Sequence, residues 1–163
     1  MESRNRIYLS LGTNLGNRVG YILRAVEGLR NLGEVEKIST LYESEPWGYK
    51  DQPPFLNCVI LLKTDLEPHY LLKALKDLER SIGRVPRFRW GPREIDIDII
   101  LYGDLIMNSP ELSIPHPRFT ERDFVLVPLL ELDPEVKDPR TGKPCKEFLK
   151  GLDIRLKPFC SLI

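Results

Sequence analysis

Hydrophobic and polar residues alternate along four stretches of the chain, with the period of two that is typical of β-strands. The clearest stretch runs from Glu94 to Leu101, where isoleucine or leucine occupies every second position and Asp96 and Asp98 lie between them. On a strand these aspartates would share the face opposite the isoleucines. The four expected strands cover residues 6–11, 35–43, 55–63 and 94–101.

Two segments between these strands repeat hydrophobic residues at helical spacing. The first stripe runs from Val19 to Leu29, and Gly33 would end that helix. The second helix would open at Glu67-Pro68, because proline suits the first turn, and Gly83 would end it. Its buried stripe consists of Leu71, Leu75, Leu78 and Ile82.

The order of these elements, β-α-β-β-α-β, is the signature of a ferredoxin-like α+β sandwich, in which an antiparallel sheet carries both helices on one face. The isoleucines of the 94–101 strand would meet the helices, and the aspartates would lie on the open face. A C-terminal extension follows, with short helices expected at residues 125–132 and 146–152. The length predicts a single domain over residues 1–163.

Asp96 and Asp98 need an explanation, because aspartate is depleted in strands. Two residues along a strand span about 6.6 Å. The two carboxylates can therefore converge on a pair of metal ions about 3.5–4 Å apart.

Upstream of the aspartates, the segment between Glu79 and Glu94 is strongly basic and holds no acidic residue. Guanidinium groups suit phosphate oxygens, and Mg²⁺ suits carboxylates together with phosphates, so the two features describe a polyphosphate site. A charged, solvated strand face beside a surface arginine cluster explains the same residues equally well. The basic residues are Arg80, Arg84, Arg87, Arg89 and Arg93.

The overall charge argues against a general nucleic-acid binder. The formal net charge is zero, from 24 basic and 24 acidic residues, whereas nucleic-acid affinity rests on a basic surface. The arginine cluster is local, which indicates a small anionic ligand. The hydrophobic content of 42% is too high for a disordered chain and predicts a packed core.

Cysteine usage and the lack of long apolar stretches favour a cytoplasmic protein. Cys58, Cys145 and Cys160 have no paired or metal-ligand spacing, so we expect free thiols in a reducing compartment, with Cys58 in the core. The amino end lacks the apolar segment of a signal peptide, and no stretch is long enough to cross a bilayer. We therefore expect neither a membrane nor a nucleic acid as a partner.

Two further places carry candidate chemistry. Phe55 and Asn57 project together at the start of a strand, and this ring and amide could stack on a flat heterocycle and bond its edge. From spacing alone, a core phenylalanine with an edge-strand asparagine is the favoured interpretation. Prolines on both sides fix the backbone of His116, although a lone histidine is more often a surface residue than a catalyst.

Four segments, in this order, resemble the 6-hydroxymethyl-7,8-dihydropterin pyrophosphokinase family of folate biosynthesis. The resemblance runs from about Ile7 to about Pro134, and its third segment is highly specific by itself. The segments are Gly12-Thr13-Asn14-Leu15-Gly16, Asp51-Gln52-Pro53-Pro54-Phe55-Leu56-Asn57, Arg89-Trp90-Gly91-Pro92-Arg93-Glu94-Ile95-Asp96-Ile97-Asp98, and Pro115-His116-Pro117-Arg118 with Arg122-Asp123-Phe124.

The resemblance implies a reaction in which the hydroxymethyl oxygen of a dihydropterin attacks the β-phosphorus of ATP, takes a pyrophosphoryl group and releases AMP. It also implies that Asp96 and Asp98 hold two Mg²⁺ ions that clamp the polyphosphate and orient the hydroxyl. Arg84 and Arg93 match positions that bind triphosphate and steady charge in the transition state. Positions around the nucleotide are matched by His116, Arg118 and Arg122.

For the pterin, the resemblance places Phe55 and Phe124 on opposite faces of the bicyclic ring. It implies that Asn57 forms hydrogen bonds with the amide and amino edge of that ring. This reverses the interpretation drawn from spacing. Glu79 matches a residue that supports the loop of Arg84, and the family favours a monomer. The walls of the pterin site would be Ser44, Pro46 and Trp90.

Three positions depart from the family's pattern. Ser44 stands where threonine is frequent and keeps the hydroxyl, while Trp47 is bulkier than the small aliphatic residue often found there. Pro86 replaces a frequent arginine of the catalytic loop and should stiffen that loop. Arg87, one place later, is a candidate for the missing arginine's role.

Two other functions use the same features. A ferredoxin-like domain can bind single-stranded RNA through aromatic residues on its open face, but here Asp96 and Asp98 would repel phosphates without metal. A phosphodiesterase would keep both metals, use water as the nucleophile and release AMP from ATP without a pterin. The expected small-molecule partners are ATP and hydroxymethyldihydropterin.

Overall fold

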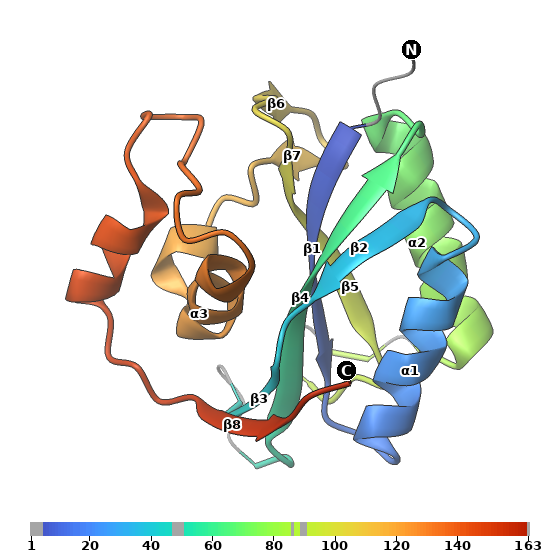
Figure 1. The fold of residues 1–163 in the computed structure, drawn as a ribbon. Coiled ribbons are helices and arrows are strands. Elements are labelled where there is room, and N and C mark those ends of the chain that lie inside the picture. The colour runs from blue at the N-terminus through green and yellow to red at the C-terminus, as the bar shows by residue number, and fades with distance from the viewer. Residues whose placement is uncertain (1–4, 47–50, 86, 89–90, 163) are drawn as a thin grey trace.

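The computed structural model describes residues 5–46, 51–85, 87–88 and 91–162. Figure 1 shows a sheet with α1 and α2 on one face and α3 on the other. Within the described residues, no helix combines the length and apolarity needed to cross a membrane. The helices are α1 (Arg18–Leu29), α2 (Pro68–Ile82) and α3 (Asp123–Leu132), with the 3₁₀ helices η1 (Phe119–Glu121) and η2 (Cys145–Gly151). The strands are β1 (Asn5–Thr13), β2 (Glu34–Ile38), β3 (Leu41–Ser44), β4 (Phe55–Thr64), β5 (Asp96–Tyr102), β6 (Met107–Asn108), β7 (Ser113–Ile114) and β8 (Lys157–Cys160).

The main sheet is antiparallel, in the order β5-β1-β4-β3-β8, and β2 also pairs with β4. This arrangement confirms the α+β sandwich of ferredoxin-like type. The expected strand 35–43 is divided, and its two halves, β2 and β3, pair with successive parts of β4. Ser39 holds the junction, because its amide donates to the Val59 carbonyl and its hydroxyl accepts from the Val59 amide, both at 2.9 Å.

The first hydrophobic core fills the space between the sheet and the two helices α1 and α2. Ile97 and Ile99 pack there, as the alternation along β5 predicts, and Cys58 lies buried in the same layer with a free thiol. Leu101 departs from the prediction. The pairing of β1 with β5 shifts register after Tyr8, which leaves an extra residue on β5 and places Leu101 in the core on the opposite face.

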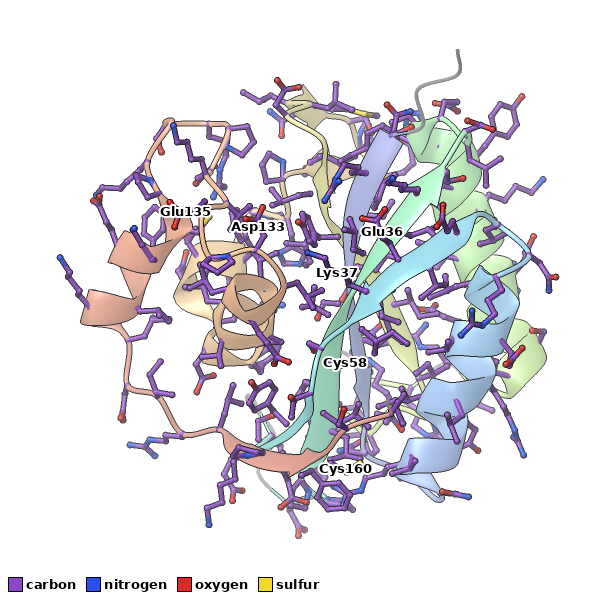
Figure 2. The ribbon with its side chains drawn as sticks, in the orientation of Figure 1. Glu36, Lys37, Cys58, Asp133, Glu135 and Cys160 are labelled. Carbon is purple, nitrogen blue, oxygen red and sulfur yellow. The ribbon has the colours of Figure 1, made fainter. Side chains whose placement is uncertain are left out.

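A second core lies on that opposite face, under α3. Val59 and Leu61 of β4 pack there with residues of α3. At the end of α3, Lys37 donates to the Leu132 carbonyl at 3.1 Å and the Tyr8 hydroxyl donates to Asp133 at 3.3 Å. Figure 2 labels Lys37 and Asp133 at this junction. The face expected to be open is therefore covered over part of its area, and a cavity lies at the end that carries the aspartates.

Gly33 does not end α1, which finishes at Leu29 with Arg30 as its cap. Gly33 lies instead where the chain enters β2, and a Cβ atom there would come within 2.1 Å of the Lys63 carbonyl oxygen. Two backbones approach too closely at this point for any side chain. Gly83 does cap α2, with the positive φ of 123° that favours glycine.

Candidate active site

Three neighbouring strands bring polar residues to one end of the sheet. In the antiparallel register, Gly12 of β1 lies opposite Asn57 of β4 and opposite Asp96 of β5, and Ser10 lies opposite Asp98. Side chains two positions apart share a face, so these residues form one patch. Glycine keeps the floor of the patch open, since an added Cβ on Gly12 would lie 3.4 Å from Asn57 Oδ1.

Arginines lie beside the paired carboxylates. Arg84 Nη2 is 3.7 Å from one oxygen of Asp96, and Arg93 Nε is 3.9 Å from the other. Burial raises the pKa of Asp98, and the negative charge of Asp96 raises it further. The two acids therefore repel each other despite the arginines beside Asp96, and a bound cation would relieve that repulsion.

Glu79 joins α2 to the strand that carries the aspartates. Its side chain is only 1% exposed, and it accepts a hydrogen bond from the Ile97 amide at 2.6 Å. Its other oxygen lies 3.6 Å from Arg84 Nη1 and 3.5 Å from Lys76 Nζ. Burial raises the pKa of Glu79, whereas the hydrogen bond from Ile97 lowers it. These are the contacts that a support for the Arg84 loop would need.

A cavity of about 250 Å³ opens at this end of the sheet. Most of the residues expected from sequence line it together, although they come from distant parts of the chain. They are Ser44, Phe55, Asn57, Arg93, Asp96, Asp98, Arg122 and Phe124. The remaining lining residues were not predicted as site residues, although Gly12 and Gly91 belong to the family motifs. They are Ser10, Gly12, Glu45 and Gly91.

Other described residues that were expected at the site are not part of the cavity lining. Arg84 contacts Asp96, as described above, while Pro46 is buried and Arg118 is exposed. Trp90 lies outside the described residues, and so do Trp47 and Pro86. The predicted wall at Trp90 therefore stays a prediction.

The amide of Asn57 is held in one orientation. Its Nδ2 donates to Ser44 Oγ at 2.6 Å, and both side chains are buried. Ser44 in turn lies opposite Phe55 in the pairing of β3 with β4. Hydroxyl, amide and ring thus form one wall of the cavity, while Phe124 enters the lining from α3.

His116 lies beside the site as a neutral ring. Burial, together with the positive charge of Arg122, lowers the pKa of His116 to about 4. Its Nδ1 accepts a hydrogen bond from the Arg118 amide at 3.2 Å, and its own amide donates to the Ile100 carbonyl at 3.0 Å. The segment between the prolines is therefore anchored to β5.

Asn14 connects two segments of the site, a role that spacing alone did not reveal. The side chain is 1% exposed, and its Nδ2 donates to Gln52 Oε1 and to the Pro53 carbonyl, both at 2.9 Å. Its Oδ1 accepts from the Arg93 amide at 2.8 Å. Only the position of Asn14 within a family motif could have signalled it.

Arg87, the candidate for the missing arginine's role, is paired with Glu94. Its Nη1 lies 2.6 Å from Glu94 Oε1, and this hydrogen bond lowers the pKa of Glu94 to about 2. Glu94 also accepts a hydrogen bond from the Val85 amide at 3.2 Å. The Glu94 carboxylate therefore binds both Val85 and Arg87.

The donors at the cavity fit a magnesium ion that arrives with its substrate. Across the described residues, no group of three or more His, Cys, Asp or Glu side chains gathers as a complete metal cage. Asp96 and Asp98 offer carboxylate oxygens, and Mg²⁺ is usually held by one or two carboxylates together with waters and substrate phosphates.

The cavity combines groups that suit two kinds of substrate, as a transferase requires. Acids and arginines suit a phosphorylated molecule, and an aromatic ring beside an oriented amide suits a flat heterocycle. Residues 8–134 match the model of the 7,8-dihydro-6-hydroxymethylpterin-pyrophosphokinase family, and the chain belongs to this family.

Similar proteins support the assignment. The chain is 50% identical over 157 residues to the 2-amino-4-hydroxy-6-hydroxymethyldihydropteridine pyrophosphokinase of Aquifex aeolicus, a match that covers 96% of this chain and 97% of that protein. The Bacillus subtilis protein of the same name is 41% identical over 140 residues, covering 85% and 84%. A folic acid synthesis protein of Pneumocystis carinii is 47% identical over 93% of this chain, which spans only 21% of that longer protein.

Among solved structures, the wild-type HPPK-DHPS protein of Plasmodium falciparum superposes with a TM-score of 0.73. The match covers 92% of this chain and 45% of that chain, at 18% sequence identity. At this identity the likeness shows a shared fold.

The neutral state of His116 predicts acid sensitivity. Its pKa is lower in the folded protein than the 6.5 of a free histidine, so the unfolded chain takes up a proton first as the pH falls. The free energy of unfolding should therefore be highest above pH 6.5 and decrease towards pH 4. The loss should be at most about 3 kcal/mol, and less where solvent screens the charge. His116→Asn keeps an acceptor for the Arg118 amide but cannot titrate. Urea unfolding at pH 7, 5.5 and 4.5 should show a flatter profile for this variant, and parallel profiles would contradict the assignment.

Proposed function

We propose that this protein transfers pyrophosphate from ATP to the hydroxymethyl group of 6-hydroxymethyl-7,8-dihydropterin and releases AMP, as a step of folate biosynthesis. A bond forms between the hydroxymethyl oxygen and the β-phosphorus, and the bond from that phosphorus to the α,β-bridging oxygen breaks. AMP leaves with the bridging oxygen, and the hydroxyl proton passes to a base or to water. The supporting observation is one cavity, in a member of this family, with two different halves. The phosphate half is lined by Arg93, Asp96, Asp98 and Arg122, and the heterocycle half by Ser44, Phe55, Asn57 and Phe124.

The heterocycle half would hold the pterin between Phe55 and Phe124. The Ser44 hydroxyl occupies one N–H of the Asn57 amide, which leaves a second N–H and the oxygen for the polar edge of the pterin. Pro46 and Trp90 would complete the walls, as the resemblance implies. Stacking and edge recognition together would place the hydroxymethyl group towards β5.

The phosphate half would use positive charge that is already in place. Arg84 and Arg93 would act as catalytic arginines, and the contact of Glu79 with Arg84 would preserve its position before ATP binds. The loss of one such preorganised donor typically costs about 3–4 kcal/mol of barrier. His116, Arg118 and Arg122 would also contact the nucleotide and its phosphates.

Asp96 and Asp98 would hold two Mg²⁺ ions on the face of β5 that lines the cavity. When bound, such ions neutralise polyphosphate charge and orient the attacking and leaving oxygens. The raised pKa of Asp98 supports this role, because an acid pair that repels itself gains most from a bound cation.

We also propose that the protein works as a cytoplasmic monomer, with residues 1–163 forming one domain. The single-domain part is supported by the two hydrophobic cores, which pack on the two faces of one sheet.

The reaction can be tested by measuring AMP release from ATP and Mg²⁺. AMP should appear only when 6-hydroxymethyl-7,8-dihydropterin is present, and in equal amount to the pyrophosphorylated pterin. Steady AMP release without the pterin would point instead to a phosphodiesterase. Micromolar binding of mixed RNA at moderate salt would revive the RNA-binding alternative.

Asp96→Asn and Asp98→Asn should each lower kcat by roughly 100-fold or more, because a neutral amide is a poor Mg²⁺ ligand. Both variants should remain folded, since the isoleucine face of β5 is unchanged and one repelling charge is removed. Asp104→Asn, at an exposed turn, is the matched control. AMP release and thermal unfolding measure the two effects, and near-normal turnover in Mg²⁺ would exclude the metal assignment.

Asn57→Ala should weaken pterin binding by roughly 1–3 kcal/mol, because the buried polar edge of the pterin would lose its partner. The KM for ATP should change little, since Asn57 lies in the heterocycle half. Asn108→Ala, at an exposed site, serves as the control. Steady-state kinetics with each substrate varied separately would show the difference, and equal effects on both KM values would argue against direct contact.

A further inference from the structure

The segment beyond the family match is attached to the wall of the cavity. The match ends at residue 134, and the chain later returns to the sheet as β8, which runs along β3 (Figure 1). Lys157 of β8 lies opposite Glu43, and the next residue of β3, Ser44, lines the cavity. β8 therefore supports the short strand that carries this part of the heterocycle half.

Arg18, at the start of α1, fastens the two ends of the loop that connects β3 to β4. Its Nη1 donates to Glu43 Oε2 at 2.9 Å and to the Pro54 carbonyl at 3.1 Å. Glu43 precedes Ser44, and Pro54 precedes Phe55. Ser44 and Phe55 lie opposite each other in the cavity wall. One guanidinium thus adds a side-chain link to the strand pairing that carries this wall.

Phe159 packs on the same guanidinium from β8. The pairing of β8 shifts register between Leu41 and Tyr42, which face Cys160 and Pro158, so Phe159 occupies a bulge. Bulges re-aim side chains, and the centroid of the Phe159 ring lies 5.2 Å from Arg18 Cζ. Cys160 next to it packs against the first core and anchors the strand (Figure 2).

We propose that Arg18 and Phe159 together are positioning residues for the pterin, an inference that rests on the proposed function. Neither residue belongs to the cavity lining, so both act through Ser44 and Phe55. The aromatic ring shields the guanidinium from water, and a less hydrated guanidinium holds its carboxylate and carbonyl partners more firmly. Without the ring, the side-chain link at the end of the β3–β4 pairing weakens, and the width of the heterocycle half is held less firmly.

Phe159→Ala should raise the KM for the pterin about five-fold, which corresponds to about 1 kcal/mol. The kcat and the KM for ATP should stay unchanged, because the phosphate half is built on β5 and the segments before it. Phe159→Tyr keeps an aromatic face and should restore the wild-type KM. Ile154→Ala is the matched control, since Ile154 is 46% exposed and Phe159 48% exposed in the same segment.

Glu43→Gln provides a second test from the other partner of Arg18, and should give the same pterin-specific defect even if Phe159→Ala does not fold. Equilibrium titration with 6-hydroxymethylpterin, followed by its own fluorescence in the presence of Mg²⁺ and a nonhydrolysable ATP analogue, should show the same ranking without turnover. Circular dichroism and thermal unfolding would verify that each variant is folded.

Two results would overturn the positioning role. One is an unchanged pterin KM in folded Phe159→Ala and Glu43→Gln, and the other is an equal rise in the KM values for both substrates. A wild-type protein without pterin-dependent AMP release would instead refute the proposed function itself. The two failures are therefore distinguishable.

Discussion

The pairing of β1 with β4 on one side and β5 on the other is the constraint on which the site depends. Because β1 lies between them, its register decides which residues of the three strands stand side by side, and Gly12 is opposite Asn57 and Asp96 at once. A slip of one residue would turn the aspartates of β5 into the core and its isoleucines outward. Burying unpaired carboxylates is so costly that the hydrophobic core indirectly fixes the geometry of the polar face.

Buried polar side chains then tie the loops to this frame. Glu79 bonds the strand between the two aspartates and contacts Arg84, and Asn14 bonds both Gln52 and the Arg93 segment. Each of these side chains is almost completely buried, so losing a partner would leave a polar group without water or a hydrogen bond. The same cost that stabilises the fold therefore holds the two halves of the cavity at a defined separation.

The two halves have different physical origins. The phosphate half concentrates charge on β5 and the segment before it, and its two acids repel each other. The heterocycle half is made of nearly neutral groups on β3, β4 and α3, and its geometry depends on hydrogen bonds and on Arg18 beneath the loop. A substitution in one half should therefore affect one substrate more than the other.

Local pattern in the sequence was sufficient for the order of the long strands and helices up to β5, for the isoleucine face of β5 and for the shared face of Asp96 and Asp98, because strand and helix periodicities depend only on near neighbours. It did not show the division of the 35–43 strand or the short strands β6, β7 and β8. Family motifs extended this to most of the cavity lining. Tertiary structure alone decided the bulge that moves Leu101 to the second core, the cover supplied by α3, and the links made by Asn14, Arg18 and Phe159. These features arise from contacts between residues far apart in the chain, and such contacts leave no periodic signal in the sequence.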